Sequence, residues 1–140
     1  MMRSLIFTLL TLVTTVDQAP QRIFFSRVFP TPGQLGLFIA NADGTDEHPL
    51  LSPADLDYDA AWSADGAWIA LTSERNGSAD IYRVHPDGSS LERLTDSPAY
   101  DDQAAFSPDG RQIVFVTTRA GGTADLWTLD VQTHRAKALT

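Results

Sequence analysis

The chain has 140 residues, which is enough for one domain. It contains no cysteine, so disulfides, thiol catalysis and zinc–thiolate sites are excluded. The formal net charge of −8 argues against a phosphate-binding surface, and therefore against nucleic acid as a partner.

The first twenty residues differ in kind from the rest. Arg3 gives a positive start, Leu5–Val13 is a short apolar run, and residues 14–20 are polar and turn-prone. This order predicts a secretory signal peptide over residues 1–20, or an N-terminal anchor if the segment is not cleaved. The apolar run is short for a membrane-spanning helix. We therefore expect an extracytoplasmic protein, periplasmic or secreted, with membrane contact only through this segment.

Residues 22–51 resemble part of a repeat that the chain then completes twice. Arg22–Ser26 matches the second strand of the repeat and Leu37–Ala40 matches the third. No segment here corresponds to the innermost strand of the repeat. We expect residues 22–51 to form an incomplete blade.

Residues 52–95 contain the first complete copy of the repeat. Its expected strands are Ala60–Ser63, Ala67–Ser73, Asp80–His85 and Leu91–Thr95. Asp65-Gly66 predicts a tight turn, and Asn76-Gly77 is a strong hairpin signal. The nearly continuous apolar run Trp68–Leu71 is typical of a strand buried on both faces.

Residues 96–140 repeat the pattern at a spacing of 44 to 45 residues. The expected strands are Ala104–Ser107, Arg111–Thr117, Asp125–Asp130 and Arg135–Thr140. A period of this length, built from short strands and turns, is typical of a β-propeller blade. The sequence therefore predicts an all-β fold of four-stranded antiparallel blades, a partial propeller with about two and three-quarter blades present.

An open stack of blades leaves edge strands unpaired and an apolar face uncovered at each end. Two arrangements would remove these open faces. The chain is either the N-terminal part of a longer propeller, or a unit that closes by self-association through its open blade edges.

Acidic residues lie ahead of both predicted innermost strands. Asp57-Tyr58-Asp59 and Tyr100-Asp101-Asp102 occupy corresponding places in the two complete repeats. We expect these segments to be loops near the mouth of the central channel, where carboxylates could bind a cation or a basic peptide segment. The structural alternative is that each aspartate caps a turn by accepting backbone N–H groups.

Other candidate chemistry is sparse. Arg75 with Asp80, and Arg119 with Asp125, flank the same hairpin in the two copies. We expect each pair to bridge the ends of its hairpin, with an anion site as the alternative. The three histidines do not converge, and no nucleophile or phosphate-loop signature is present. We therefore expect no catalytic residue, no metal site and no cofactor.

The repeat motifs resemble those of a known family. Residues 105–115, 118–127 and 138–140 are similar to the WD-like propeller repeat of the TolB family, which also occurs in tricorn-type and prolyl-oligopeptidase-type peptidases. The resemblance covers residues 22–140. It implies a binding or scaffolding domain outside the cytoplasm, because in the TolB family the propeller is a periplasmic partner of envelope proteins. The chain departs from that family in having no recognisable α/β domain ahead of the blades.

Two functions follow as expectations. The first is a non-enzymatic, exported TolB-like propeller segment that binds a protein or peptide. The alternative is the N-terminal propeller fragment of a serine peptidase that lacks its catalytic domain. The repeat motif serves many roles, so it does not by itself decide between them.

Overall fold

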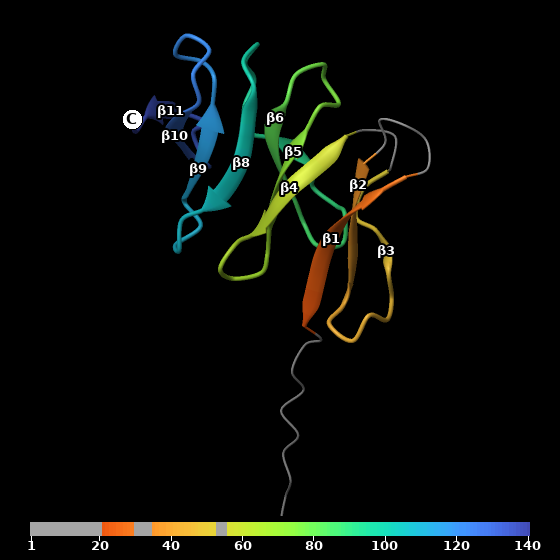
Figure 1. Ribbon diagram of the computed structural model, residues 1–140. Coiled ribbons are helices and arrows are strands. Elements are labelled where there is room, and N and C mark those ends of the chain that lie inside the picture. The colour runs from red at the N-terminus through yellow and green to blue at the C-terminus, as the bar shows by residue number, and fades with distance from the viewer. Residues whose placement is uncertain (1–20, 30–34, 53–55) are drawn as a thin grey trace, which may run out of the picture.

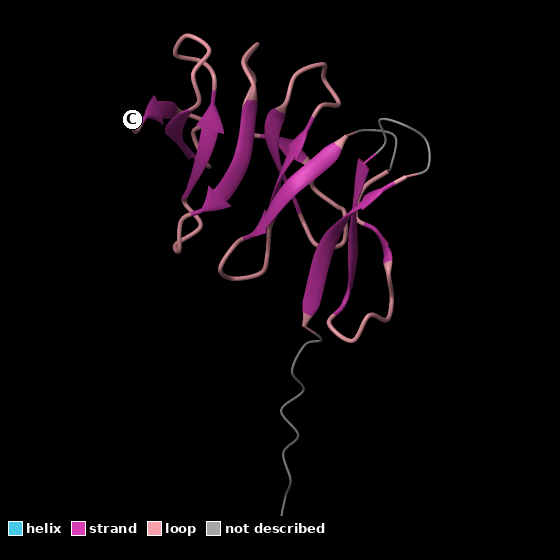
Figure 2. Ribbon diagram, in the orientation of Figure 1, coloured by secondary structure: helices cyan, strands magenta, loops and turns pink. Residues whose placement is uncertain are grey.

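The computed structural model describes residues 21–29, 35–52 and 56–140, and all of its regular structure is β (Figures 1 and 2). Eleven strands in this part of the chain form three antiparallel sheets. These sheets confirm the prediction of an all-β partial propeller. The described residues contain no helix that is long and apolar enough to cross a membrane. The predicted signal peptide or anchor, residues 1–20, lies outside the described residues.

Each sheet corresponds to one blade. The first blade contains β1 (Arg22–Val28), β2 (Leu35–Asn41) and β3 (His48–Pro49) in that order. The second contains β4 (Asp57–Trp62), β5 (Ile69–Ser73), β6 (Asp80–Val84) and β7 (Glu92–Arg93). The third contains β8 (Asp101–Phe106), β9 (Gln112–Thr117), β10 (Asp125–Asp130) and β11 (Ala136–Ala138). The three sheets lie side by side (Figure 1). The first strands of the second and third blades, β4 and β8, are next to each other.

The innermost strands β4 and β8 begin three residues earlier than predicted, because each contains a bulge. Asp59 in β4 and Gln103 in β8 adopt left-handed backbone conformations, with φ of 46° and 54°. The pairing register with the next strand shifts at both positions. A bulge lets a strand continue through a polar segment and turns its side chains toward a new direction. The prediction that residues 57–59 and 101–102 form loops is therefore wrong.

Hydrophobic side chains fill the two spaces between blades. The first core joins Leu37, Ile39 and Leu50 of the first blade to Ile69, Leu71, Tyr82 and Val84 of the second. The second core joins Ala70, Ile81 and Leu94 to Ala104, Ile113, Phe115, Leu129 and Val131 of the third blade. Successive residues of a strand point to opposite faces, so β5 contributes to both cores. This explains its continuous apolar sequence.

Gly88 offers a test of how closely the first two blades approach. It lies in the turn between β6 and β7 with φ of 80°, and a Cβ added there would lie 2.7 Å from the backbone oxygen of Leu50 in the first blade. Gly44 occupies the matching turn of the first blade with φ of 82°, and a Cβ there would meet nothing within 4 Å. Both glycine-to-alanine substitutions place a side chain in left-handed backbone, which costs about 1–2 kcal/mol. We expect Gly88→Ala to cost about 1–3 kcal/mol more, because of the added clash.

Urea unfolding of Gly88→Ala and Gly44→Ala measures this difference directly. Equal midpoints for the two variants would contradict the close approach between the turn and Leu50. A larger loss for Gly44→Ala would contradict it more strongly.

Candidate functional site at the inner strands

The six residues predicted at the channel mouth fall into two groups in the structure. Asp57 and Asp101 are buried, with 1% and 0% of their surface exposed. Tyr58 and Asp102 are half-buried, Asp59 is exposed, and Tyr100 precedes β8 with 63% of its surface exposed. The buried carboxylates, Asp57 and Asp101, and the four more accessible side chains are therefore described separately.

The buried carboxylates form ion pairs inside their own blades. Asp57 accepts two hydrogen bonds from Arg75 Nη2, at 2.9 and 3.0 Å. Asp101 accepts hydrogen bonds from Arg119 and from Thr117 Oγ1, the latter at 2.6 Å. Each pair ties the start of an innermost strand to the hairpin that follows the second strand. Buried charges are tolerated where they are paired and hydrogen-bonded in this way.

The arginine pairings expected from the sequence are wrong. Arg75 and Arg119 do not bridge the ends of their hairpins to Asp80 and Asp125, because they reach back to the innermost strands. The reason is the early start of those strands. Pairing with the end of the second strand places Asp57 and Asp101 within reach of an arginine two residues beyond it.

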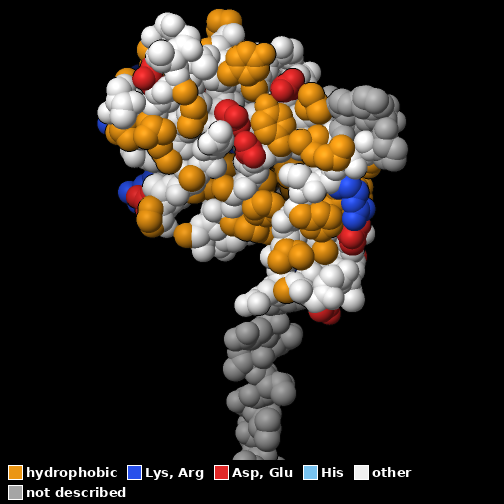
Figure 3. Space-filling view, in the orientation of Figure 1, with side chains coloured by type: hydrophobic (Ala, Val, Ile, Leu, Met, Phe, Trp, Pro, Cys, Tyr) orange, Lys and Arg blue, Asp and Glu red, His pale blue; other side chains and the backbone are white. Residues whose placement is uncertain are grey.

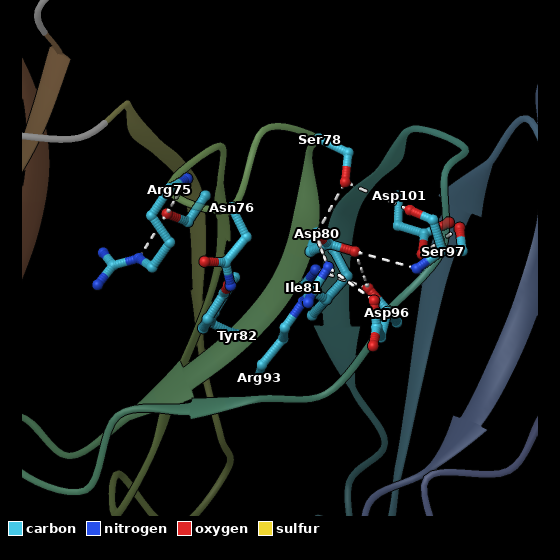
Figure 4. Close-up of polar contacts among 12 residues, drawn as sticks. Arg75, Asn76, Ser78, Asp80, Ile81, Tyr82, Arg93, Asp96, Ser97 and Asp101 are labelled. Carbon is cyan, nitrogen blue, oxygen red and sulfur yellow. Dashed lines mark hydrogen bonds and ion pairs between the residues drawn. The ribbon is translucent and has the colours of Figure 1, made fainter.

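Asp80 instead belongs to a network that joins the second and third blades. It is fully buried and pairs with Arg93 Nη2 at 2.6 Å, and the same nitrogen lies 3.0 Å from Asp96 Oδ1. Ser78 Oγ donates to Asp80 at 3.1 Å and contacts the Ser97 backbone oxygen at 3.3 Å. These residues form one polar strip that reaches Asp101 (Figure 4). The strip holds the segment that leads from β7 to β8.

Sequence reasoning missed this network, because the repeat gives no signal for it. In the third blade, Ala138 occupies the position of Arg93. A comparison of the two copies therefore shows Arg93 as an arginine without a counterpart in the third blade, and it gives no hint of its partner. Only the position of Arg93 beside Asp80 across β6 and β7 identifies the pair.

The accessible carboxylates of Asp59 and Asp102 come from neighbouring inner strands. Partial burial of the Asp59 carboxyl and the nearby charge of Asp102 raise the pKa of Asp59. Thr72 Oγ1 donates to Asp102 Oδ1 at 2.9 Å and holds that carboxylate in place. In the space-filling view, acidic side chains lie among hydrophobic ones in the region of β4 and β8 (Figure 3). The sequence grouped Asp59 with Asp102, but it gave no signal for the hydrogen bond from Thr72 to Asp102.

Tyr58 is oriented by a second acidic side chain. Its hydroxyl donates to Glu74 Oε1 at 3.0 Å. Burial, and then the hydrogen bond and charge of Glu74, raise the pKa of Tyr58 above its ordinary value. The phenol therefore stays protonated and keeps this hydrogen bond at neutral pH. Tyr58 presents a fixed ring beside the carboxylate pair.

The arrangement suits the recognition of a positive group. Two carboxylates that lie close together resist simultaneous ionisation, and a cation between or beside them relieves this repulsion. In the described residues, no group of three or more His, Asp or Glu side chains has the geometry to hold a metal ion. A lysine or arginine side chain of a partner needs fewer ligands than a metal ion, and two fixed carboxylates can accept its hydrogen bonds.

Comparison with known proteins places the fold. The family model described as the TolB beta propeller domain matches residues 21–140. A protein TolB homolog of Chlorobium luteolum is 32% identical over 107 residues, covering 76% of this chain and 24% of the relative. The chain therefore spans about a quarter of the length of this curated relative.

Solved structures agree with this placement. The structure of a putative TolB from Agrobacterium tumefaciens has a TM-score of 0.76 and 26% identity, over 86% of this chain and 45% of that chain. The structure of puromycin hydrolase has a TM-score of 0.71 and 20% identity, over 86% of this chain and 20% of that chain. At 20% identity, the likeness to puromycin hydrolase shows the fold alone.

Proposed function

Because the chain belongs to the TolB β-propeller family, we propose that it is a non-enzymatic binding module that acts outside the cytoplasm and takes a basic segment of a protein or peptide at its inner strands. The observation that carries this proposal is the position of Asp59 and Asp102 on the neighbouring inner strands β4 and β8, where Thr72 of the second blade donates to Asp102 at 2.9 Å. The extracytoplasmic location rests on the sequence order of residues 1–20, as well as on the family.

The chemistry of the pair favours a cationic side chain as ligand. Asp102 is fixed by Thr72, so its position does not have to be ordered when a ligand arrives. The net charge of −8 adds a general attraction for basic partners. Tyr58, held by Glu74, gives the site a ring against which an arginine or a lysine stem could pack.

The alternative, a propeller segment of a serine peptidase, has weaker support. The likeness to puromycin hydrolase concerns the fold and carries no activity. The groups at the inner strands are carboxylates and hydrogen-bonded hydroxyls, which can accept a cation without any covalent step. A binding module therefore accounts for the residues of this site without the catalytic domain that a peptidase would also need.

Removing the carboxylate pair should weaken the binding of a basic peptide. We expect the double variant Asp59→Asn/Asp102→Asn to bind a fluorescent peptide of alternating lysine and glycine at least about tenfold more weakly, because hydrogen bonds to charged groups contribute about 1.5–3 kcal/mol. Fluorescence anisotropy measures the affinity. The matched control is Asp96→Asn/Asp125→Asn, which removes the same charge from elsewhere on the chain.

The comparison between these variants decides the proposal. If both double variants weaken the peptide equally, the attraction belongs to the acidic surface in general and the proposed site is wrong. The pH dependence adds a second readout. Only the ionised Asp59 carboxylate attracts an ammonium group, so binding is complete above its raised pKa and declines as the pH falls through that value. Asp59→Asn should lose the part of this decline that belongs to Asp59, and any dependence that remains belongs to Asp102.

A further inference from the structure

The outer face of the third blade is apolar and only partly covered. In the second blade, Ala70, Thr72 and Ile81 are fully buried against the third blade. The repeat places Val114, Val116 and Leu126 at the same positions of the third blade. There, Leu126 is 40% exposed and the two valines are half-buried, because no other described sheet covers them.

The outer face of the first blade is also apolar. Ile23 pairs with Ala40 across β1 and β2, as Ile69 pairs with Val84 in the second blade and Ile113 with Leu129 in the third. In those two blades the isoleucine is buried against the preceding blade, with 0% and 1% exposed. Ile23, by contrast, is 44% exposed.

Aromatic side chains extend this first face. Phe25 stacks on Phe38 with ring centroids 5.8 Å apart, and Phe29 lies 5.9 Å from Phe38. The guanidinium of Arg27 lies 4.5 Å from the centre of the Phe38 ring. Phe25 occupies the position of Leu71 and Phe115, which are fully buried between blades. Phe38 and Ala40 on this face are already buried, with 7% and 3% exposed, so Ile23 and Phe25 form its accessible apolar part. These positions match those that the second and third blades use to cover a neighbour.

We propose that the outer face of the third blade binds the outer face of the first blade in a second copy of this chain, head to tail. The two open faces are the two halves of an interface that the chain already forms twice within itself. Covering them would remove apolar surface from water, which favours association. At the two internal interfaces, the residues at the equivalent repeat positions are buried against the neighbouring blade.

Closure by two copies follows from the size of the full propeller. The three blades of this chain align with 45% of the putative TolB structure, so that chain has room for about twice as many blades. A head-to-tail interface gives a closed ring when its rotation completes the circle, and an open filament otherwise. The arrangement of the three blades as a whole resembles that in the similar structure, with a TM-score of 0.76. Two copies would therefore complete one ring through two equal contacts.

The mass of the full chain in solution tests this inference. Light scattering after size exclusion should give twice the chain mass of 15.3 kDa. Leu126→Glu and Ile23→Arg should each give a monomer with a wild-type circular dichroism spectrum. The control is Leu91→Glu, which changes a leucine that is 37% exposed and directly precedes β7 of the central blade. It should leave the dimer intact. All these variants share one N-terminus, so association through residues 1–20 would not distinguish them.

Mixing the two variants distinguishes head-to-tail contact from other dimers. Leu126→Glu leaves the first-blade face intact, and Ile23→Arg leaves the third-blade face intact. The mixture should form dimers again, because one contact is wild-type and the other brings opposite charges together. A monomeric wild-type chain overturns the inference, as does a dimer that survives either substitution. Failure of the mixture to restore the dimer also overturns it. The result is independent of the peptide-binding proposal, because neither outer face contains Asp59 or Asp102.

Discussion

Arg119→Met is expected to lower the free energy of unfolding by about 3 kcal/mol, because it leaves a buried carboxylate without its counter-charge. Asp101 is fully buried, and the Arg119 side chain retains 21% exposure. After the substitution, the remaining side-chain donors to Asp101 are Thr117 Oγ1 at 2.6 Å and Ser97 Oγ at 3.4 Å. Two neutral hydroxyls cannot replace a guanidinium, and the methionine restores the apolar stem but not the charge.

The matched control is Arg111→Met, which makes the same change at an exposed arginine of the same blade. We expect it to alter stability by no more than about 0.5 kcal/mol. Chemical denaturation of both variants gives the comparison. The double variant Asp101→Asn/Arg119→Met should be more stable than the sum of the two single losses predicts, since it leaves no unpaired charge. Equal losses for Arg119→Met and Arg111→Met would show that the ion pair is not needed for the fold.

The blade architecture could be predicted from the sequence, because it depends on local signals that repeat. Asp65-Gly66 and Asp109-Gly110 form the expected turns. In each, the aspartate accepts a hydrogen bond from the backbone N–H two residues later. The apolar run of β5 correctly indicated a strand covered on both faces. These features depend on turn chemistry and on period-two burial, and both can be read from single segments.

The candidate site could be predicted only in part. The acidic positions were found, but their roles depend on a bulge that no local signal marks. Asp59 is not a residue type that demands a left-handed backbone, although Asp adopts it more readily than most. Because of this bulge, Asp57 turns into the blade and pairs with Arg75, while Asp59 remains accessible. The extra residue of the bulge therefore gives Asp57 a structural role and leaves Asp59 as a candidate ligand.

The buried ion pairs explain why a propeller blade can keep charges next to its core. The Asp57–Arg75 and Asp101–Arg119 pairs lie at the same end of successive blades. The Asp80–Arg93 pair, on β6 and β7, lies between these two pairs, and Ser97 follows it in the connection from β7 to β8 (Figure 4). These polar contacts are directional, whereas the apolar faces between blades are not. We infer that the strip sets the relative orientation of the second and third blades while hydrophobic burial supplies the main stabilisation.

Phe115→Ala is expected to have the largest effect on the contact between these two blades, with a loss of about 3–5 kcal/mol. Phe115 is 1% exposed and packs in the core that Ala70, Ile81 and Leu129 share across the two sheets. Small neighbours such as Ala70 and Ala104 cannot move far enough to fill the space that the ring leaves. The cavity should therefore persist and add to the lost transfer free energy.

The location of the damage makes this prediction specific to a stack of blades. Each blade contacts only its neighbours, so weakening one interface should release the third blade before the first. Native-state hydrogen exchange should show the largest loss of protection in β8 to β10 and little change in β2. Tyr100→Ala, an aromatic deletion at a residue 63% exposed, serves as the control and should leave both regions protected. Uniform loss of protection across all three blades would mean that the sheets unfold as a single unit. The interface at Phe115 would then stabilise the whole chain, not one junction within it.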